Sequence, residues 1–168
     1  AQTVLADEAL AARDFERALA ALPTFTPALA ALGRQAMRQG RWGDVRQRFE
    51  TEIAQLEESL NKPLAQEVRE RTIRGVLTRY YRVARVLEQQ LAEPDTALVY
   101  HKRALALSPR FLPAFLAIER TYEQAGRWRE LVALYRGLVD RAAGSDLNAG
   151  PLLTRAAEVL QSRLGDDR

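Results

Sequence analysis

Apolar side chains recur at intervals of three and four residues along nearly the whole chain, which is the period of an amphipathic α-helix. β-Branched residues are sparse, whereas the helix-favouring residues Ala, Leu, Arg, Glu and Gln dominate. Prolines, glycines and short polar stretches interrupt this periodicity, and Pro27, Pro63, Pro113 and Pro151 fall where first helical turns accept proline. The pattern predicts an all-α protein with about eight helices, over residues 7–22, 27–39, 43–60, 63–91, 94–107, 112–125, 128–142 and 150–164.

The chain also repeats itself at an offset of 86 residues. Gly40-Arg41-Trp42 recurs as Gly126-Arg127-Trp128, and Pro27-Ala28 recurs as Pro113-Ala114, without a gap between the matches. A weaker match at an offset of 73 residues aligns Arg82-Val83-Ala84 with Arg155-Ala156-Ala157. Repetition at fixed offsets is typical of proteins built from stacked, similar helix pairs.

Two stretches resemble parts of a tetratricopeptide repeat. Residues Leu32-Gly33 through Gly40-Arg41-Trp42 to Phe49 resemble a first helix, its turn and the start of a second helix. Ala97-x-x-x-His101-x-x-Ala104-Leu105, closed by Pro109, resembles a second helix, and repeat units that begin near Thr78 and Leu112 have the 34-residue period of the family. The resemblance covers nearly the whole chain. It implies a single solenoid segment over residues 1–168, a right-handed superhelix of antiparallel helix pairs.

One unit departs from this period. Thr26 and Thr78 are 52 residues apart, which is 18 more than one period. Shared between two adjacent helices, the excess lengthens each by roughly 13 Å at 1.5 Å per residue. We therefore expect the helices 43–60 and 63–91 to form an extended antiparallel hairpin that overshoots its neighbours.

Both ends of the chain resemble an internal junction between helices. Leu5-Ala6-Asp7 and Leu164-Gly165-Asp166 each align with Leu91-Ala92-Glu93, which predicts that a helix ends near Leu5. We therefore expect the chain to be a segment of a longer solenoid. Its Arg-, Ala- and Leu-rich repeats resemble those of large bacterial tetratricopeptide proteins.

Composition narrows the chemistry. The chain has 25 Lys or Arg, 22 Asp or Glu, one His and no Cys, so disulfides and thiolate metal sites are excluded. No catalytic or phosphate-binding motif occurs, and His101 falls at a large-residue position of a repeat, which predicts a packing or surface role. We predict no catalytic residue, metal, cofactor or small-molecule substrate. No apolar run approaches the roughly 20 residues of a membrane span, and a soluble segment suits either cytoplasm or periplasm.

The arginines are the most suggestive set. In tetratricopeptide superhelices the first helices of the repeats line a concave groove, and the resemblance assigns arginines to several of those positions. The candidate partner-binding residues are Arg34, Arg38, Arg79, Arg82, Gln89, Arg120 and Glu123. Because the guanidinium group binds carboxylates in bidentate fashion, an acidic peptide would suit such a groove. The alternative is that these arginines only solvate the helix surfaces.

The sequence favours a non-catalytic scaffold that binds a partner protein or peptide, since stacked helix pairs present long binding surfaces. A nucleic-acid-binding repeat is the first alternative, because the pI is about 9.6. The scarcity of lysine and the interspersed charges disfavour it. A regulatory or assembly arm of a larger enzyme is the second alternative.

Overall fold

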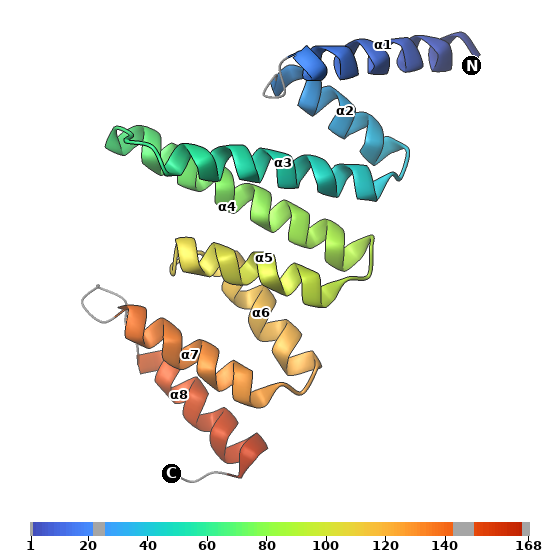
Figure 1. The fold of residues 1–168 in the computed structure, drawn as a ribbon. Coiled ribbons are helices and arrows are strands. Elements are labelled where there is room, and N and C mark those ends of the chain that lie inside the picture. The colour runs from blue at the N-terminus through green and yellow to red at the C-terminus, as the bar shows by residue number, and fades with distance from the viewer. Residues whose placement is uncertain (1, 22–25, 143–149, 166–168) are drawn as a thin grey trace. The chain divides into compact units, whose positions relative to one another are not determined.

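The structure is a computed structural model that describes residues 2–21, 26–142 and 150–165. These residues form helices joined by short turns, with no strand among them (Figure 1). The helices are α1 (Gln2–Ala21), α2 (Thr26–Arg38), α3 (Trp42–Leu60), α4 (Gln66–Gln89), α5 (Pro94–Leu107), α6 (Leu112–Gln124), α7 (Trp128–Ala142) and α8 (Gly150–Val159), which continues as the π-helical turn η1 (Leu160–Leu164). The predicted all-α fold is confirmed within the described part of the chain.

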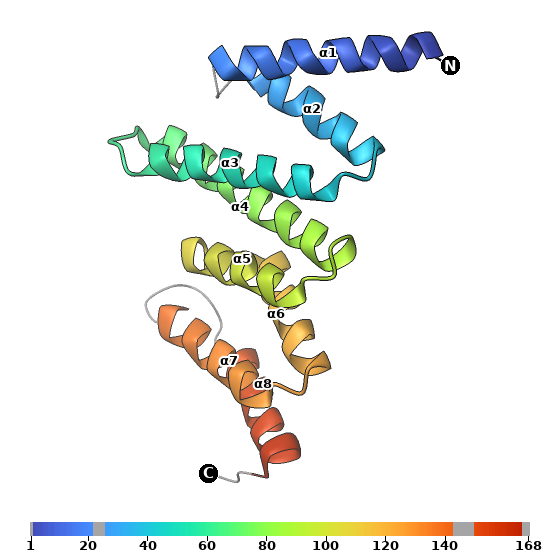
Figure 2. The same cartoon turned by 45° about the vertical axis from the view of Figure 1, so that its right-hand side comes forward.

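The chain divides into two compact units, Ala1–Glu93 and Pro94–Arg168, called unit 1 and unit 2 below. In unit 1, α2 packs against α1 and α3, and α3 packs against α4; in unit 2, α6 packs against α5 and α7, and α7 packs against α8 and η1. Consecutive helices such as α3 and α4 run in opposite directions side by side in both views (Figures 1 and 2). Packing between sequence neighbours is the pattern of helical-repeat proteins. A single right-handed superhelix through both units stays a prediction.

The offset of 86 residues is reproduced in the backbone. Helices α2 and α6 each have 13 residues, and the next helix begins at a tryptophan in both cases. Gly40 and Gly126 both have a φ of 64°, the left-handed conformation that ends a helix and that glycine adopts without strain. The N–H of Arg41 donates to the carbonyl of Ala36 at 2.9 Å, and the N–H of Arg127 donates to that of Tyr122 at 2.8 Å.

The offset of 73 residues also holds. Ala92 follows the end of α4 with a φ of 54°, and Gly165 follows η1 with a φ of 62°. These two left-handed residues are 73 positions apart. The same offset pairs Arg82 of unit 1 with Arg155 of unit 2.

The hairpin α3–α4 is extended, as predicted. Its helices have 19 and 24 residues, against 13 in α2. The buried apolar seam of α4 consists of Val76, Tyr80, Val83 and Leu87. The hydroxyl of Tyr80 donates a hydrogen bond to the carboxylate of Glu57 on α3. The hairpin is thus held by apolar packing with a polar contact across it.

His101 is 1% exposed and lies in the core of unit 2. Ile118, Leu131 and Tyr135 of the same unit are also buried. Its side chain occupies the position that the repeat pattern assigns to a large packing residue. The prediction of a packing role fits this burial.

Two helix starts differ from the sequence prediction. The helix predicted over residues 7–22 begins at Gln2 instead, and it continues through Leu5, where the junction pattern predicts that a helix ends. Residue 22, the predicted last residue, lies outside the described range. The reason is that Pro94, which disfavours helical backbone before it, follows the junction at Ala92, whereas Glu8 stands at the corresponding position near the N-terminus.

The second difference is at the hairpin turn. Helix α4 begins at Gln66, with Ala65 as its N-cap at a ψ of 147°, so Pro63 precedes the helix. The prediction that Pro63 lies in the first turn was wrong. The three residues 63–65 lie outside the helices and leave the chain room to reverse direction.

Candidate functional site

A pocket that contains predicted groove residues lies in unit 1, between α2, α3 and α4. Its volume is about 530 Å³. The apolar part of its lining comes from Ala30 and Met37 of α2, Val45 and Phe49 of α3, and Val86 of α4. This site is called the α2–α4 pocket below.

The charged part of the lining is strongly basic. Arg34 of α2, Arg48 of α3, and Arg79 and Arg82 of α4 line the pocket together with one carboxylate, that of Glu52 on α3. Four guanidinium groups therefore share a small apolar space with a single acidic side chain. The arrangement has an excess of positive charge that its own lining does not neutralise.

The arginines differ in their partners. Arg79 Nε lies 2.7 Å from Glu52 Oε2, and Arg79 Nη1 donates to the carbonyl of Gly75 at 3.3 Å. Arg34 and Arg82 are exposed and form no ion pair with any residue that the structure describes. These two guanidinium groups have donors available to a bound anion.

Arg48 is held in a less hydrated setting. Burial lowers the pKa of its guanidinium below the ordinary value, and the nearby carboxylates of Asp44, Glu16 and Glu52 oppose that shift. The group stays charged, because arginine does not lose its proton in proteins at physiological pH. A partly desolvated cation gains more from a carboxylate partner than a fully hydrated one does.

The pocket brings together three of the predicted site residues, Arg34, Arg79 and Arg82. Arg38, the last residue of α2, and Gln89, the last residue of α4, are exposed on the same helices but do not line it.

Arg120 and Glu123 belong to α6 in unit 2. Glu123 Oε1 lies 3.3 Å from Arg155 Nη2 of α8, so its carboxylate is already engaged within the unit. The prediction that these two residues share one groove with the arginines of unit 1 stays a prediction.

Arg48 and Glu52 of the lining were not predicted from the sequence. The groove was assigned to first helices alone, whereas α3, which the repeat pattern predicts to be a second helix, forms the wall between α2 and α4. The spacing of the buried residues Val45 and Phe49 could have revealed them, because Arg48 and Glu52 follow on the adjacent helical face.

Chemically, an apolar floor bordered by arginines suits a ligand that carries both carboxylates and apolar groups. No group of three or more His, Cys, Asp or Glu side chains that could hold a metal ion occurs among the described residues. None of the helices in that part of the chain is long and apolar enough to cross a membrane.

Comparison with known proteins supports the repeat assignment. Residues 114–148 match the tetratricopeptide repeat family, over most of the unit predicted to begin near Leu112. Neither a curated protein nor a solved structure matches the chain. Tetratricopeptide repeats generally serve as scaffolds for protein–protein interaction and are typically not catalytic. The described residues are all-helical in their regular structure, and the matched segment supports a tetratricopeptide-type repeat at residues 114–148.

Proposed function

We propose that this chain is a protein-interaction scaffold that binds an acidic segment of a partner protein in the α2–α4 pocket. The observation that carries the proposal is the composition of the pocket lining: four arginines and one glutamate surround an apolar floor. An extended or helical peptide with glutamate or aspartate side chains beside an apolar residue complements both features.

The energetics favour such a ligand over a purely charged one. A hydrogen bond to a charged group contributes about 1.5–3 kcal/mol, and burial of one large apolar side chain contributes about 1.5–3 kcal/mol. Exposed ion pairs alone contribute about 0–1 kcal/mol each. The apolar floor formed by Val45, Phe49 and Val86 is therefore as important to the proposal as the arginines.

The test is direct binding of a short fluorescein-labelled peptide in which glutamates flank a leucine, measured by fluorescence anisotropy. The double variant Arg34→Glu/Arg82→Glu should abolish binding, because both residues are exposed and reversal places like charges against the ligand. Circular dichroism should show unchanged helicity.

The matched control is Arg69→Glu/Arg71→Glu, which makes the same charge change on exposed residues of α4. These positions lie at least eight residues before Arg79, or roughly 12 Å along the helix, which exceeds the Debye length of about 8 Å at physiological ionic strength. The control should bind nearly as well as the wild type. Equal affinity of the groove variant and the wild type would refute the proposal.

The same experiment discriminates against nucleic acid as the ligand. A labelled single-stranded oligonucleotide should bind weakly, and its binding should not depend on Arg34 and Arg82 in particular. Tight binding with steep salt dependence, lost in the same double variant, would replace the proposal with a nucleic-acid function.

A further inference from the structure

The two units carry the same architecture at the place of the α2–α4 pocket, but with different side chains. The 86-residue offset pairs α2 with α6 and α3 with α7, and the 73-residue offset pairs α4 with α8. Arg34 of unit 1 then corresponds to Arg120 of unit 2, and Arg82 corresponds to Arg155.

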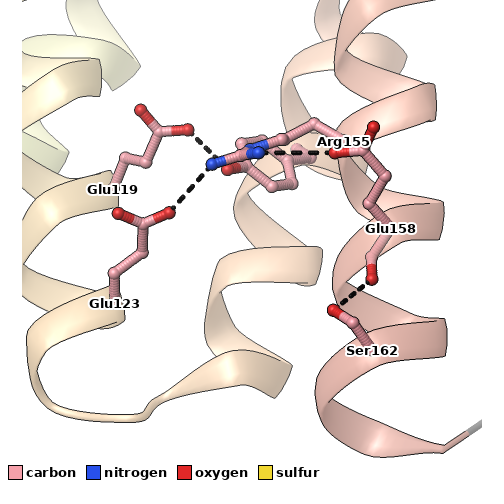
Figure 3. Close-up of polar contacts among 6 residues, drawn as sticks. Glu119, Glu123, Arg155, Glu158 and Ser162 are labelled. Atoms are coloured by element: carbon pink, nitrogen blue, oxygen red, sulfur yellow. Dashed lines mark hydrogen bonds and ion pairs between the residues drawn. The ribbon is translucent and has the colours of Figure 1, made fainter.

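In unit 2 the arginine that corresponds to Arg82 forms ion pairs with carboxylates of the same unit. Arg155 Nη2 lies 3.3 Å from Glu123 Oε1, and its Nη1 lies 3.3 Å from Glu158 Oε2. The hydroxyl of Tyr135 donates to Glu119 Oε1 at 2.5 Å. Figure 3 shows Glu119 and Glu123 on α6 pointing toward Arg155, which reaches across from α8.

These contacts stabilise the charged form of Arg155. Hydrogen bonding to Tyr135 and Glu158, with a smaller contribution from the charge of Glu123, raises the pKa of its guanidinium. A pocket of about 330 Å³ remains beside Glu123 and Arg155; its lining includes Trp128 and Arg163 but not Glu119. The guanidinium of Arg155 is thus supplied with carboxylates from within its own unit.

In unit 1 the corresponding carboxylates are missing. Gly33 stands at the position of Glu119, and Met37 stands at that of Glu123. Both residues line the α2–α4 pocket together with Arg82, and the side chain of Met37 is 40% exposed. Phe49 replaces Tyr135 and removes its hydroxyl. The pocket of unit 1 therefore retains the arginine and lacks the acids that accompany it in unit 2.

From this comparison we infer that one carboxylate of the bound acidic segment contacts Arg82 in the way that Glu123 contacts Arg155. Met37 is then the specificity-determining residue, since an uncharged side chain there leaves Arg82 open to an acid from the partner. Unit 1 is the open form of a site that unit 2 fills internally. This inference rests on the proposed function, because it assigns the position of the partner's carboxylate within the same pocket.

The inference predicts that a carboxylate built into unit 1 displaces the partner. The variant Met37→Glu should place a carboxylate beside Arg82, as Glu123 lies beside Arg155. The introduced carboxylate competes with the peptide for Arg82, and an ion pair with a formation constant of about 2–5 should lower the affinity for the labelled acidic peptide about three- to sixfold. Met37→Gln, which has the same shape without the charge, is the matched control and should bind nearly as the wild type does.

A second measurement tests the geometry without any ligand. The variants Met37→Glu, Arg82→Met and their combination form a double-mutant cycle, followed by urea unfolding. The new ion pair between the introduced carboxylate and Arg82 should show favourable coupling, about a two- to fivefold effect on the unfolding equilibrium constant. The cycle cancels the unfavourable effect of an acid near the C-terminus of α2, because that effect is present with and without Arg82.

The outcomes separate the inference from the proposed function. If the wild type fails to bind the acidic peptide, the proposed function fails and the inference fails with it. If the wild type binds but Met37→Glu binds equally well, or the cycle shows no coupling, the proposed function stands and only the inference is overturned. Reduced binding by Met37→Glu together with favourable coupling supports both.

Discussion

The single carboxylate in the α2–α4 pocket should have opposite effects on stability and on binding. Glu52 Oε2 lies 2.7 Å from Arg79 Nε, and the two side chains are 21% and 30% exposed. Exposed pairs contribute about 0–1 kcal/mol and breaking a buried pair costs about 3–5 kcal/mol. Because Glu52→Gln keeps an acceptor for the guanidinium, we expect the free energy of unfolding to fall by about 1 kcal/mol.

Binding should change in the other direction. The carboxylate of Glu52 repels an acidic ligand and forms an ion pair with Arg79, one of the four arginines of the pocket. The substitution Glu52→Gln therefore removes a negative charge and leaves the guanidinium of Arg79 without its ion-pair partner. At a separation of roughly 8 Å and an effective dielectric constant of about 40–80, the repulsion amounts to about 0.5–1 kcal/mol. The affinity for the labelled acidic peptide should therefore rise about two- to fivefold.

The assays are urea unfolding followed by circular dichroism and peptide binding followed by anisotropy. Glu50→Gln is the control, because Glu50 lies on the same helix and pairs with Arg46 at 2.9 Å but does not line the pocket. It should lower stability by a similar or smaller amount and leave affinity unchanged. If Glu52→Gln bound the acidic peptide no more tightly than the wild type, the electrostatic reasoning about the pocket would be wrong.

Further substitutions test the fold by urea unfolding. Gly40→Ala should destabilise by about 1–2 kcal/mol because its φ is 64°, whereas Gly43→Ala, whose added Cβ meets no atom within 4 Å, should stabilise by up to about 1 kcal/mol; the reverse order would contradict the helix-end assignment. Ile118→Ala, at a fully buried position, should cost about 2–5 kcal/mol, and a cost below about 1 kcal/mol would argue against this core. Tyr135→Phe tests the alkaline limb of stability, because burial and the hydrogen bond to Glu119 raise the pKa of the Tyr135 phenol above its ordinary value of about 10. A raised folded pKa gives stability that is complete below about pH 10 and is lost as pH rises through the folded pKa. The wild type should therefore lose stability more steeply than Tyr135→Phe above about pH 10, and parallel pH profiles would contradict this.

Much of the fold could be predicted because its signals are local. Apolar periodicity and helix-ending glycines such as Gly40 and Gly126 act within one turn of the chain, and both are visible in the sequence. The helix start at Gln2 was missed because the repeat match at Leu5 was given more weight than the absence of a proline after it. The two places differ at the position after the match, which is Pro94 in one and Glu8 in the other, and proline disfavours helical backbone before it.

The candidate site was predicted less completely because a pocket depends on contacts between helices. The repeat positions predicted that Arg34, Arg79 and Arg82 line one groove, and all three line the α2–α4 pocket. The same positions could not show that Glu123 pairs with Arg155, 32 residues further along the chain. Charge counts along a sequence do not distinguish an acid that is free to meet a ligand from one that is already paired.

The basic character of the α2–α4 pocket arises partly from the absence of the carboxylates that unit 2 has at the corresponding positions. Arg34 and Arg82 have arginine counterparts in unit 2, whereas Arg48 and Arg79 correspond by the same offsets to Leu134 and Leu152, so the pocket of unit 1 has more bases as well as fewer acids. Where Glu123 accompanies Arg155, the uncharged Met37 accompanies Arg82. A repeat protein can thus convert an internally neutralised site into a ligand site by losing a carboxylate, which disturbs the helix packing less than adding a buried cation would. On this reasoning, the removal of acids from inner helix faces is a better sequence signal for an anion-binding repeat than the total number of arginines.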